Sequence, residues 1–190
     1  MALAILGLGA ASAISIQKIV VLGNREAAAQ DGARQVGATW SSRLELDALV
    51  WNDPNGISDI HETRWLFASI PKGPSEPLSV SDWMIAPEIL GFGSPAAGMQ
   101  GEDVYLSDDI GRGFHCTHIR LARVIDEKTL GFGVPAKVTV LADIRVVWRK
   151  DLAPMVECRT TPPQQIENND EGYSFYRLPP ILLLRNEASP

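Results

Sequence analysis

The chain has 190 residues, of which 45% are hydrophobic and 21% are charged, and its mean hydropathy is near zero. This apolar content suits one packed domain, and it excludes a disordered chain and a membrane protein with many spans. The 17 Lys and Arg residues against 23 Asp and Glu residues give a net charge of -6, and no basic run occurs. The sequence therefore lacks the electrostatic footprint of a nucleic-acid-binding protein.

The first 17 residues carry no charged side chain, and the first charge is Lys18. Apolar residues occupy every face of a helix there, which is typical of a membrane span or a fully buried helix. Three interpretations stay open: a cleaved secretory signal, a permanent anchor, or the first helix of a soluble domain. Residues 11–13 (Ala-Ser-Ala) imitate a signal cleavage site, but no basic segment precedes the apolar run.

The helical pattern continues beyond this segment, with charged and amide residues between apolar positions spaced by three and four. Proline and glycine within residues 52–56 end the pattern. We therefore predict one helix over residues 1–51, roughly 75 Å long, with an apolar half (1–22) and an amphipathic half (23–51). The recurring apolar positions of the second half are Ala29, Ala33, Val36, Trp40, Leu44 and Ala48.

Residues 137–149 alternate between apolar and polar side chains, which predicts a strand of an antiparallel sheet with one buried and one wet face. We expect flanking strands over 116–125 and 155–160, with a turn at 151–154. The predicted fold class is α+β, a long N-terminal helix packed on a small antiparallel sheet. The packing residues are expected to be Val36, Trp40, Leu44, Val138, Val140, Ile144, Val146 and Trp148.

The start of the chain, Met1-Ala-Leu-Ala-Ile-Leu-Gly-Leu-Gly, resembles the type IV pilins and the pseudopilins of type II secretion. In that family a processing signal ending in glycine precedes a run like F-T-L-I-E-V, then V-A-L-A-I-L and an amphipathic half-helix. Residues 2–6 match the later part, whereas the glycine, the aromatic residue and the glutamate would lie before Met1. We therefore expect this sequence to be truncated at its start. Residues 116–160 are more loosely similar to the closing region of minor pilins of the PilV type and of pseudopilin I.

The resemblance implies a structural subunit with a pilin-like fold. Residues 1–22 would hold the chain in the bacterial inner membrane as a single pass and later pack in the core of a type IV pilus or pseudopilus. Residues 52–190 would form a periplasmic head. The partners would be other major and minor pilins or pseudopilins, an inner-membrane assembly platform and a prepilin peptidase. The membrane or filament-core side chains would be Leu3, Ile5, Leu6, Leu8, Ile14 and Ile16.

Two parts of the head have no counterpart in the resemblance. Residues 57–113, the variable loop of the head, are rich in Pro, Gly and Ser, and a short helix is expected near Ser81 and Asp82. Similar octapeptides at 90–97 and 130–137 reflect either coincident turn chemistry or a pair of partner-contact loops. The apolar run 181–184 is either an edge strand that completes the sheet or a patch for a neighbouring subunit.

The cysteines and histidines form one small cluster. We interpret His115, Cys116 and His118 as a buried cysteine beside surface histidines, because the second ligand pair of a zinc site is missing. An extracytoplasmic head permits disulfides, and Cys116 and Cys158 fall in neighbouring regions of the predicted sheet. We expect a disulfide between them, with two reduced, buried cysteines as the alternative.

The acidic loop 101–113 gives only a weak calcium signal, because its spacing does not match an EF-hand. Nucleophile, P-loop and dinucleotide signatures are absent from the sequence. We therefore predict no catalytic residues, no metal, no cofactor and no enzymatic activity. The carboxylates of the acidic loop are Glu102, Asp103, Asp108 and Asp109.

The alternative function is a periplasmic enzyme or ligand-binding domain that carries an N-terminal signal or anchor. Its weakness is the predicted helix, which continues for about thirty residues past the anchor. Such a helix suits stacking against similar helices better than it suits a simple tether.

Overall fold

The computed structural model describes residues 2–51, 63–66, 78–108, 110–125, 138–169 and 171–184. In this part of the chain a long helix, α1 (Ala2–Trp51), precedes a seven-stranded antiparallel sheet. The predicted α+β class is therefore confirmed. The remaining elements are β1 (Leu78–Val80), β2 (Met84–Ile85), β3 (Ala96–Ala97), η2 (Ile110–Arg112), β4 (His115–Ile125), β5 (Val138–Arg149), α3 (Pro163–Glu167), β6 (Tyr173–Arg177) and β7 (Ile181–Leu184).

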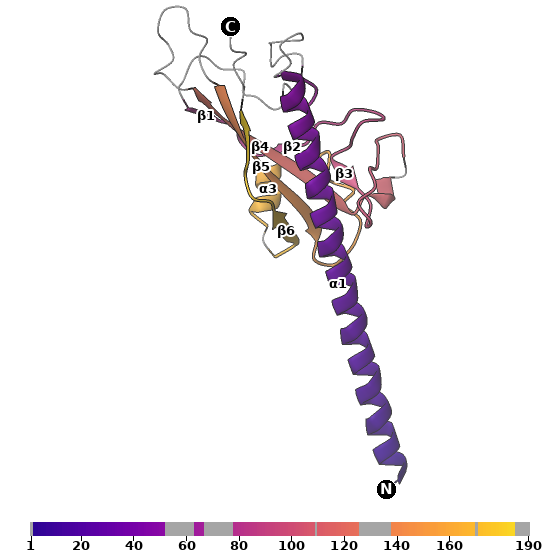
Figure 1. Cartoon of the computed structure of the whole chain (residues 1–190). Coiled ribbons are helices and arrows are strands. Elements are labelled where there is room, and N and C mark those ends of the chain that lie inside the picture. The colour runs from indigo at the N-terminus through magenta and orange to yellow at the C-terminus, as the bar shows by residue number, and fades with distance from the viewer. Residues whose placement is uncertain are drawn as a thin grey trace, which may run out of the picture.

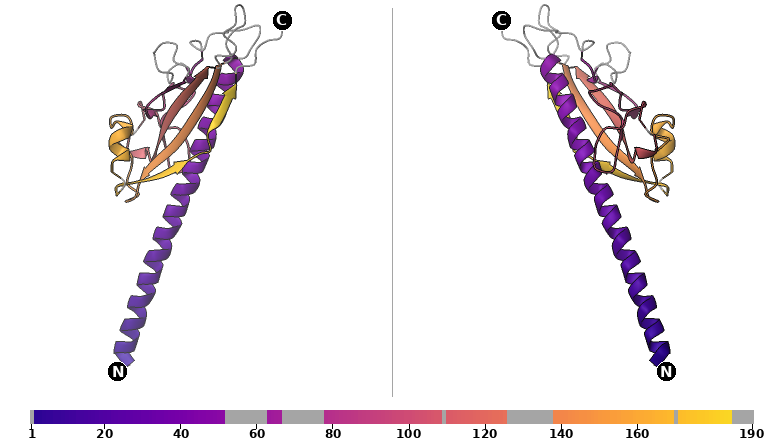
Figure 2. Two further views of the ribbon diagram at one scale, coloured as in Figure 1. Left: turned by 90° about the vertical axis from the view of Figure 1, so that its left-hand side faces the viewer. Right: turned by 90° about the vertical axis from the view of Figure 1, so that its right-hand side faces the viewer.

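Helix α1 is a rod of 50 residues, about 75 Å long, and only its C-terminal half lies against the head. Figures 1 and 2 show the sheet and loops gathered around this half, with the N-terminus far below them. The apolar side chains that α1 buries in the head are the six predicted from spacing alone: Ala29, Ala33, Val36, Trp40, Leu44 and Ala48.

The centre of the sheet is the pair β4 and β5, which match residue for residue from Cys116 opposite Val147 to Ile125 opposite Val138. The short strands β1, β2 and β3 line the other edge of β4, and β6 and β7 line the other edge of β5. The two long strands are rich in β-branched and aliphatic residues, which favour extended backbone. The apolar side chains on one face of these strands pack against α1. The predicted strand over 116–125 is thus confirmed, and so is the strand over 137–149 from Val138 onward, since Lys137 lies outside the described residues.

The face of the sheet toward α1 carries the predicted apolar side chains of β5. Val140, Ile144, Val146 and Trp148 are buried in one cluster with Trp40 of α1. The side chain of Val138 lies outside the described part of the chain. The described side chains of β5 that were predicted to face α1 therefore do so.

The opposite face of the sheet is not wet, as we expected, but forms a second small core. Arg145 and Val147, on the predicted polar parity, are completely buried. Residues 152–166 fold back over this face, and Met155 and Ile166 pack there against Val147. Alternation along one strand could not reveal this cover, because it comes from a segment further along the chain.

Two other expectations about the head are wrong. Residues 155–160 form turns and not a strand, because Met155 and Cys158 face inward to the second core. The strands beside β5 come instead from the tail, where 181–184 is the predicted edge strand, β7. No helix begins near Ser81, whose backbone N–H donates to the Leu121 carbonyl oxygen (2.8 Å) and whose hydroxyl accepts from the Leu121 N–H (2.9 Å).

The point where α1 enters the head is fixed by a close approach of backbone to backbone. A Cβ added to Gly32 would lie 2.3 Å from the Met99 carbonyl oxygen and 2.8 Å from Cε1 of His115. The His115 ring lies there because its Nε2 is 2.8 Å from the Ala29 carbonyl oxygen and its Nδ1 is 3.0 Å from that of Gly98. Glycine at position 32 is therefore required by space and not by backbone conformation.

At the other end of α1, a buried carboxylate holds a loop segment. Asp47 accepts hydrogen bonds from the backbone N–H groups of Arg64 (3.2 Å), Trp65 and Leu66 (3.0 Å). This places Trp65 edge-on against Trp40, with ring centroids 5.1 Å apart. An acidic residue near a helix C-terminus opposes the helix dipole, so Asp47 is explained by the loop that it binds.

We predict that Gly32→Ala lowers the free energy of unfolding by about 1–3 kcal/mol, because the methyl group overpacks against the Met99 backbone. The control is Gly23→Ala, where nothing lies within 4 Å of the new Cβ. This control is expected to leave stability unchanged or raise it by up to about 1 kcal/mol, since alanine favours helix. Urea titration of the full chain in detergent measures both, and equal effects would contradict the close approach.

We also predict that Asp47→Ala costs about 2–4 kcal/mol of stability, because it leaves buried backbone N–H groups without an acceptor. Glu45→Ala, an exposed acid two residues away, should cost less than about 0.5 kcal/mol. The same urea titration, followed by tryptophan fluorescence of Trp40 and Trp65, distinguishes the two variants. A loss below that of Glu45→Ala would show that Asp47 does not hold the segment.

Candidate functional site

The exposed stretch of α1, residues 13–28, has no cover from its own head. Its large apolar side chains are exposed by between 49% (Leu22) and 70% (Ile19). Successive residues of a helix point about 100° apart, so these side chains surround the helix and do not form one stripe. An apolar surface of this kind on every side is rarely left in water. The side chains concerned are Ile14, Ile16, Ile19, Val20, Val21 and Leu22.

The residues predicted for a membrane or filament core fall in and before this stretch. Ile14 and Ile16 are exposed by 65% and 62% and touch no part of the head core. Leu3, Ile5, Leu6 and Leu8 belong to the backbone of α1, but their side chains lie outside the described residues. Within the residues that the structure describes, no helix combines the length and apolarity needed to cross a membrane.

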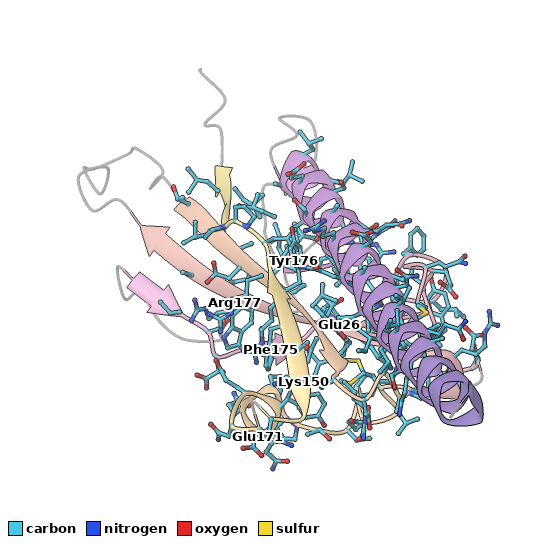
Figure 3. The ribbon with its side chains drawn as sticks, turned by 90° about the horizontal axis from the view of Figure 1, so that it is seen from below. Glu26, Lys150, Glu171, Phe175, Tyr176 and Arg177 are labelled. Carbon is cyan, nitrogen blue, oxygen red and sulfur yellow. A yellow bond between two sulfur atoms is a disulfide. The ribbon has the colours of Figure 1, made fainter. Side chains whose placement is uncertain are left out.

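Three charged side chains, Lys18, Arg25 and Glu26, interrupt the exposed stretch. Among the described residues, the first ion pair along α1 joins Arg34 to Asp31 at 3.2 Å, above the point where the helix reaches the head. Figure 3 looks up from the N-terminal side and labels Glu26 on α1 together with Lys150 and Glu171 of the head. Of these three charges, Lys18 is the one that lies among the large apolar side chains of residues 14–22.

The disulfide predicted between Cys116 and Cys158 is present and joins β4 to the segment that covers the second core. By the loop-length relation a bridge of this span contributes about 4 kcal/mol. Both sulfurs are buried, so the bond closes the core and offers no exposed reactive thiol.

Beside the disulfide lies a buried cation that the sequence did not reveal. Arg145 Nε donates to Nδ1 of His118 (3.1 Å), and Nη2 donates to the Pro163 carbonyl oxygen (3.1 Å). Nη1 pairs with Glu167 at 3.2 Å, and the guanidinium lies 4.2 Å from the ring centroid of Trp83. Arg145 lies on the face of β5 that the sequence predicts to be polar. Its burial could not be predicted there, because its partners come from other segments.

The two histidines of the cluster are buried, whereas we expected them on the surface. Burial is the main cause that lowers the pKa of His118 to about 3, with a further lowering from the Arg145 charge. Burial also lowers the pKa of His115, opposed by its hydrogen bonds to the Ala29 and Gly98 carbonyl oxygens. His61 lies outside the described residues. The His118 ring is thus a neutral structural group at pH 7.

The acidic loop is held by the protein's own groups. Asp103 pairs with Arg43, and Asp108 accepts from the Tyr105 N–H at 2.8 Å. Glu102 is exposed, and Asp109 lies outside the described residues. Over the described ranges, no three His, Cys, Asp or Glu side chains come together as metal ligands.

A hollow of about 450 Å³ opens at the C-terminal end of α1, at the opposite end of the helix from the exposed stretch. Its walls are mostly apolar, and the Arg64 guanidinium lies 4.1 Å from the ring centroid of Phe92. Its volume is in the range of small-molecule sites, and it is partly open to solvent. The lining residues are Arg43, Leu46, Asp47, Val50, Arg64, Trp65 and Phe92.

No family model, curated protein or solved structure matches this chain.

The lowered pKa of His118 predicts a loss of stability in acid. The unfolded chain takes up a proton near pH 6.5, whereas the folded ring stays neutral to about pH 3. Between these values the unfolded state binds more protons, so unfolding becomes easier as the pH falls. Between pH 7 and pH 5 the expected loss from this group is about 2 kcal/mol, and His115 adds to it in the same direction.

The variant His118→Asn removes this titration and keeps an acceptor for Arg145 Nε. Its urea midpoint should depend less on pH than that of the wild type between pH 7 and pH 5, whatever its absolute stability. Parallel profiles for the two proteins would contradict the assignment.

Proposed function

We propose that this chain is a structural subunit that assembles through the exposed half of α1, as a pilin-like minor pilin or pseudopilin. The observation that carries the proposal is the division of one continuous helix. Residues 29–48 bury one face in the head, whereas residues 14–22 present large apolar side chains on all sides of the helix. A helix that is apolar all round requires an apolar environment on every side, which lipid or a bundle of similar helices supplies.

The form of the head supports the same proposal. Its antiparallel sheet packs on one side of the amphipathic half-helix, and Figure 2 shows the lower half of α1 projecting free of it. The head therefore leaves the lower half accessible to neighbours. The function lies in the contacts of this helix, and the buried histidines, the disulfide and the acidic loop serve the head's stability.

The sequence resemblance supports a location for such a subunit. We propose that the chain is held in the bacterial inner membrane with its head in the periplasm, and is then drawn into a type IV pilus or type II pseudopilus. Its partners would be other pilins or pseudopilins, the assembly platform and the prepilin peptidase. We propose the PilV or pseudopilin-I type on residues 116–149 of that resemblance alone, because the short strand expected over 155–160 is absent.

A second candidate is a periplasmic ligand-binding domain on an N-terminal anchor. The hollow beside Trp65 and Phe92 is the observation that favours it. The two candidates differ in what the exposed half of α1 does, since an anchored domain needs no helix-to-helix assembly.

The test is the assembly of the full chain after detergent removal, followed by sedimentation and electron microscopy. Val20→Asp places a charge on the exposed half, where burial of an aspartate costs about 2.5–3.5 kcal/mol, and it should reduce assembly roughly 100-fold. Leu106→Asp is the matched control, because Leu106 is an equally exposed apolar residue of the head. It should assemble like the wild type.

Near-UV circular dichroism checks that the head of each variant is folded. A wild-type chain that stays monomeric without detergent, or a Val20→Asp variant that assembles normally, would contradict the proposal. Either result would favour the anchored ligand-binding domain.

A further inference from the structure

The ammonium group of Lys18 lies in the middle of the apolar stretch of α1. The residues one turn away on either side are Ile14 and Leu22, both exposed and apolar. If neighbouring helices cover this stretch, they cover Lys18 as well. A cation taken out of water needs a carboxylate partner, since the cost of leaving it unpaired is several kcal/mol.

The acid that can serve Lys18 is Glu26, the one carboxylate within residues 13–28. It lies eight residues further along the same helix, about 12 Å, and no ion pair joins the two side chains in the described structure. The next acid, Asp31, already pairs with Arg34. The exposed stretch thus carries one acid, Glu26, and two bases, Lys18 and Arg25, none of which forms an ion pair in the described structure. Arg25 lies beside Glu26 at the head end, whereas Lys18 is the base that lies among the exposed apolar side chains of residues 14–22.

We propose that Lys18 of one copy pairs with Glu26 of a second, parallel copy displaced by eight residues, about 12 Å, along the helix axis. This inference rests on the proposed assembly through α1 and adds its partner and its register. The chain supplies both halves of the contact, which favours a second copy over an unrelated protein. Each copy then offers a free Glu26 or Lys18 to the next, so the contact propagates as a heterologous interface does.

The other simple arrangements of two copies fit less well. Parallel helices in register would place Lys18 beside Lys18 and Glu26 beside Glu26, which is repulsive. An antiparallel pair would satisfy both charges but would close at two copies. It would leave apolar side chains such as Ile19 and Val21 uncovered on the remaining faces.

The experiment is zero-length carbodiimide crosslinking of the full chain assembled from equal amounts of unlabelled and nitrogen-15-labelled protein. The reagent condenses the Lys18 amine with a carboxylate into an amide, with loss of water. We expect a ladder of dimers, trimers and larger species. Mass spectrometry should identify a mixed-isotope Lys18–Glu26 peptide, which shows that the amide joins two molecules.

Charge reversal tests the same pair without a reagent. Lys18→Glu and Glu26→Lys should each reduce assembly by about tenfold or more, as loss of a covered ion pair predicts, and the double variant should restore it. The matched control is Arg112→Glu, which makes the same change in net charge at an exposed residue of the head and should assemble within about twofold of the wild type. Substitution of Lys18 or Glu26 leaves the head unchanged, because residues 13–28 make no part of its core.

The outcomes separate this register from the proposed function. Assembly without a Lys18–Glu26 amide, an amide confined to dimers, or a double variant that fails to recover would overturn the register and leave assembly through α1 intact. A wild-type chain that stays monomeric would overturn both. The ladder together with recovery of the double variant would establish the pairing.

Discussion

The packing of α1 on β4 and β5 is the constraint on which the rest of the structure depends. Trp40 and Leu44 sit in the middle of that contact, and the small residues Ala29, Gly32 and Ala33 let the sheet come close where the helix enters the head. A single continuous helix cannot bend away below this point without losing its backbone hydrogen bonds. The same packing that fixes the head therefore projects the apolar half of α1 away from it.

The head itself is built as two cores on the two faces of one sheet. The larger core faces α1, and the smaller one holds the disulfide together with Met155 and Ile166. Arg145 lies beside the smaller core with His118, Glu167 and Trp83 as partners. Because these partners come from separate segments, the arrangement ties α3 and the loop before β2 to the central strands and gives the head a fixed shape.

The exposed apolar half of α1 below the folded head is the feature on which the proposed subunit role rests. Within the described residues, the two cysteines form a disulfide, His115 and His118 are buried, and Asp103 forms an ion pair with Arg43. Lys18, Arg25 and Glu26, the charged residues of the exposed stretch, form no ion pair in the described structure and lie where a neighbouring copy would cover them. The contacts that matter for the proposed function are thus between molecules.

Elements with a regular spacing of apolar residues along the chain could be predicted without the structure. The spacing of Ala29 to Ala48 gave both the length of α1 and its buried face, and alternation over 138–149 placed β5 with its helix-facing side. Three features could be known from the folded structure alone. Arg145 is buried, the segment 155–160 forms turns that cover the second core, and Asp47 accepts hydrogen bonds from the loop segment 64–66. Each of these depends on a partner distant in the chain, and local periodicity carries no information about such a partner. The apolar half of α1 was visible in the sequence, but its freedom from the head is a fact of three-dimensional packing.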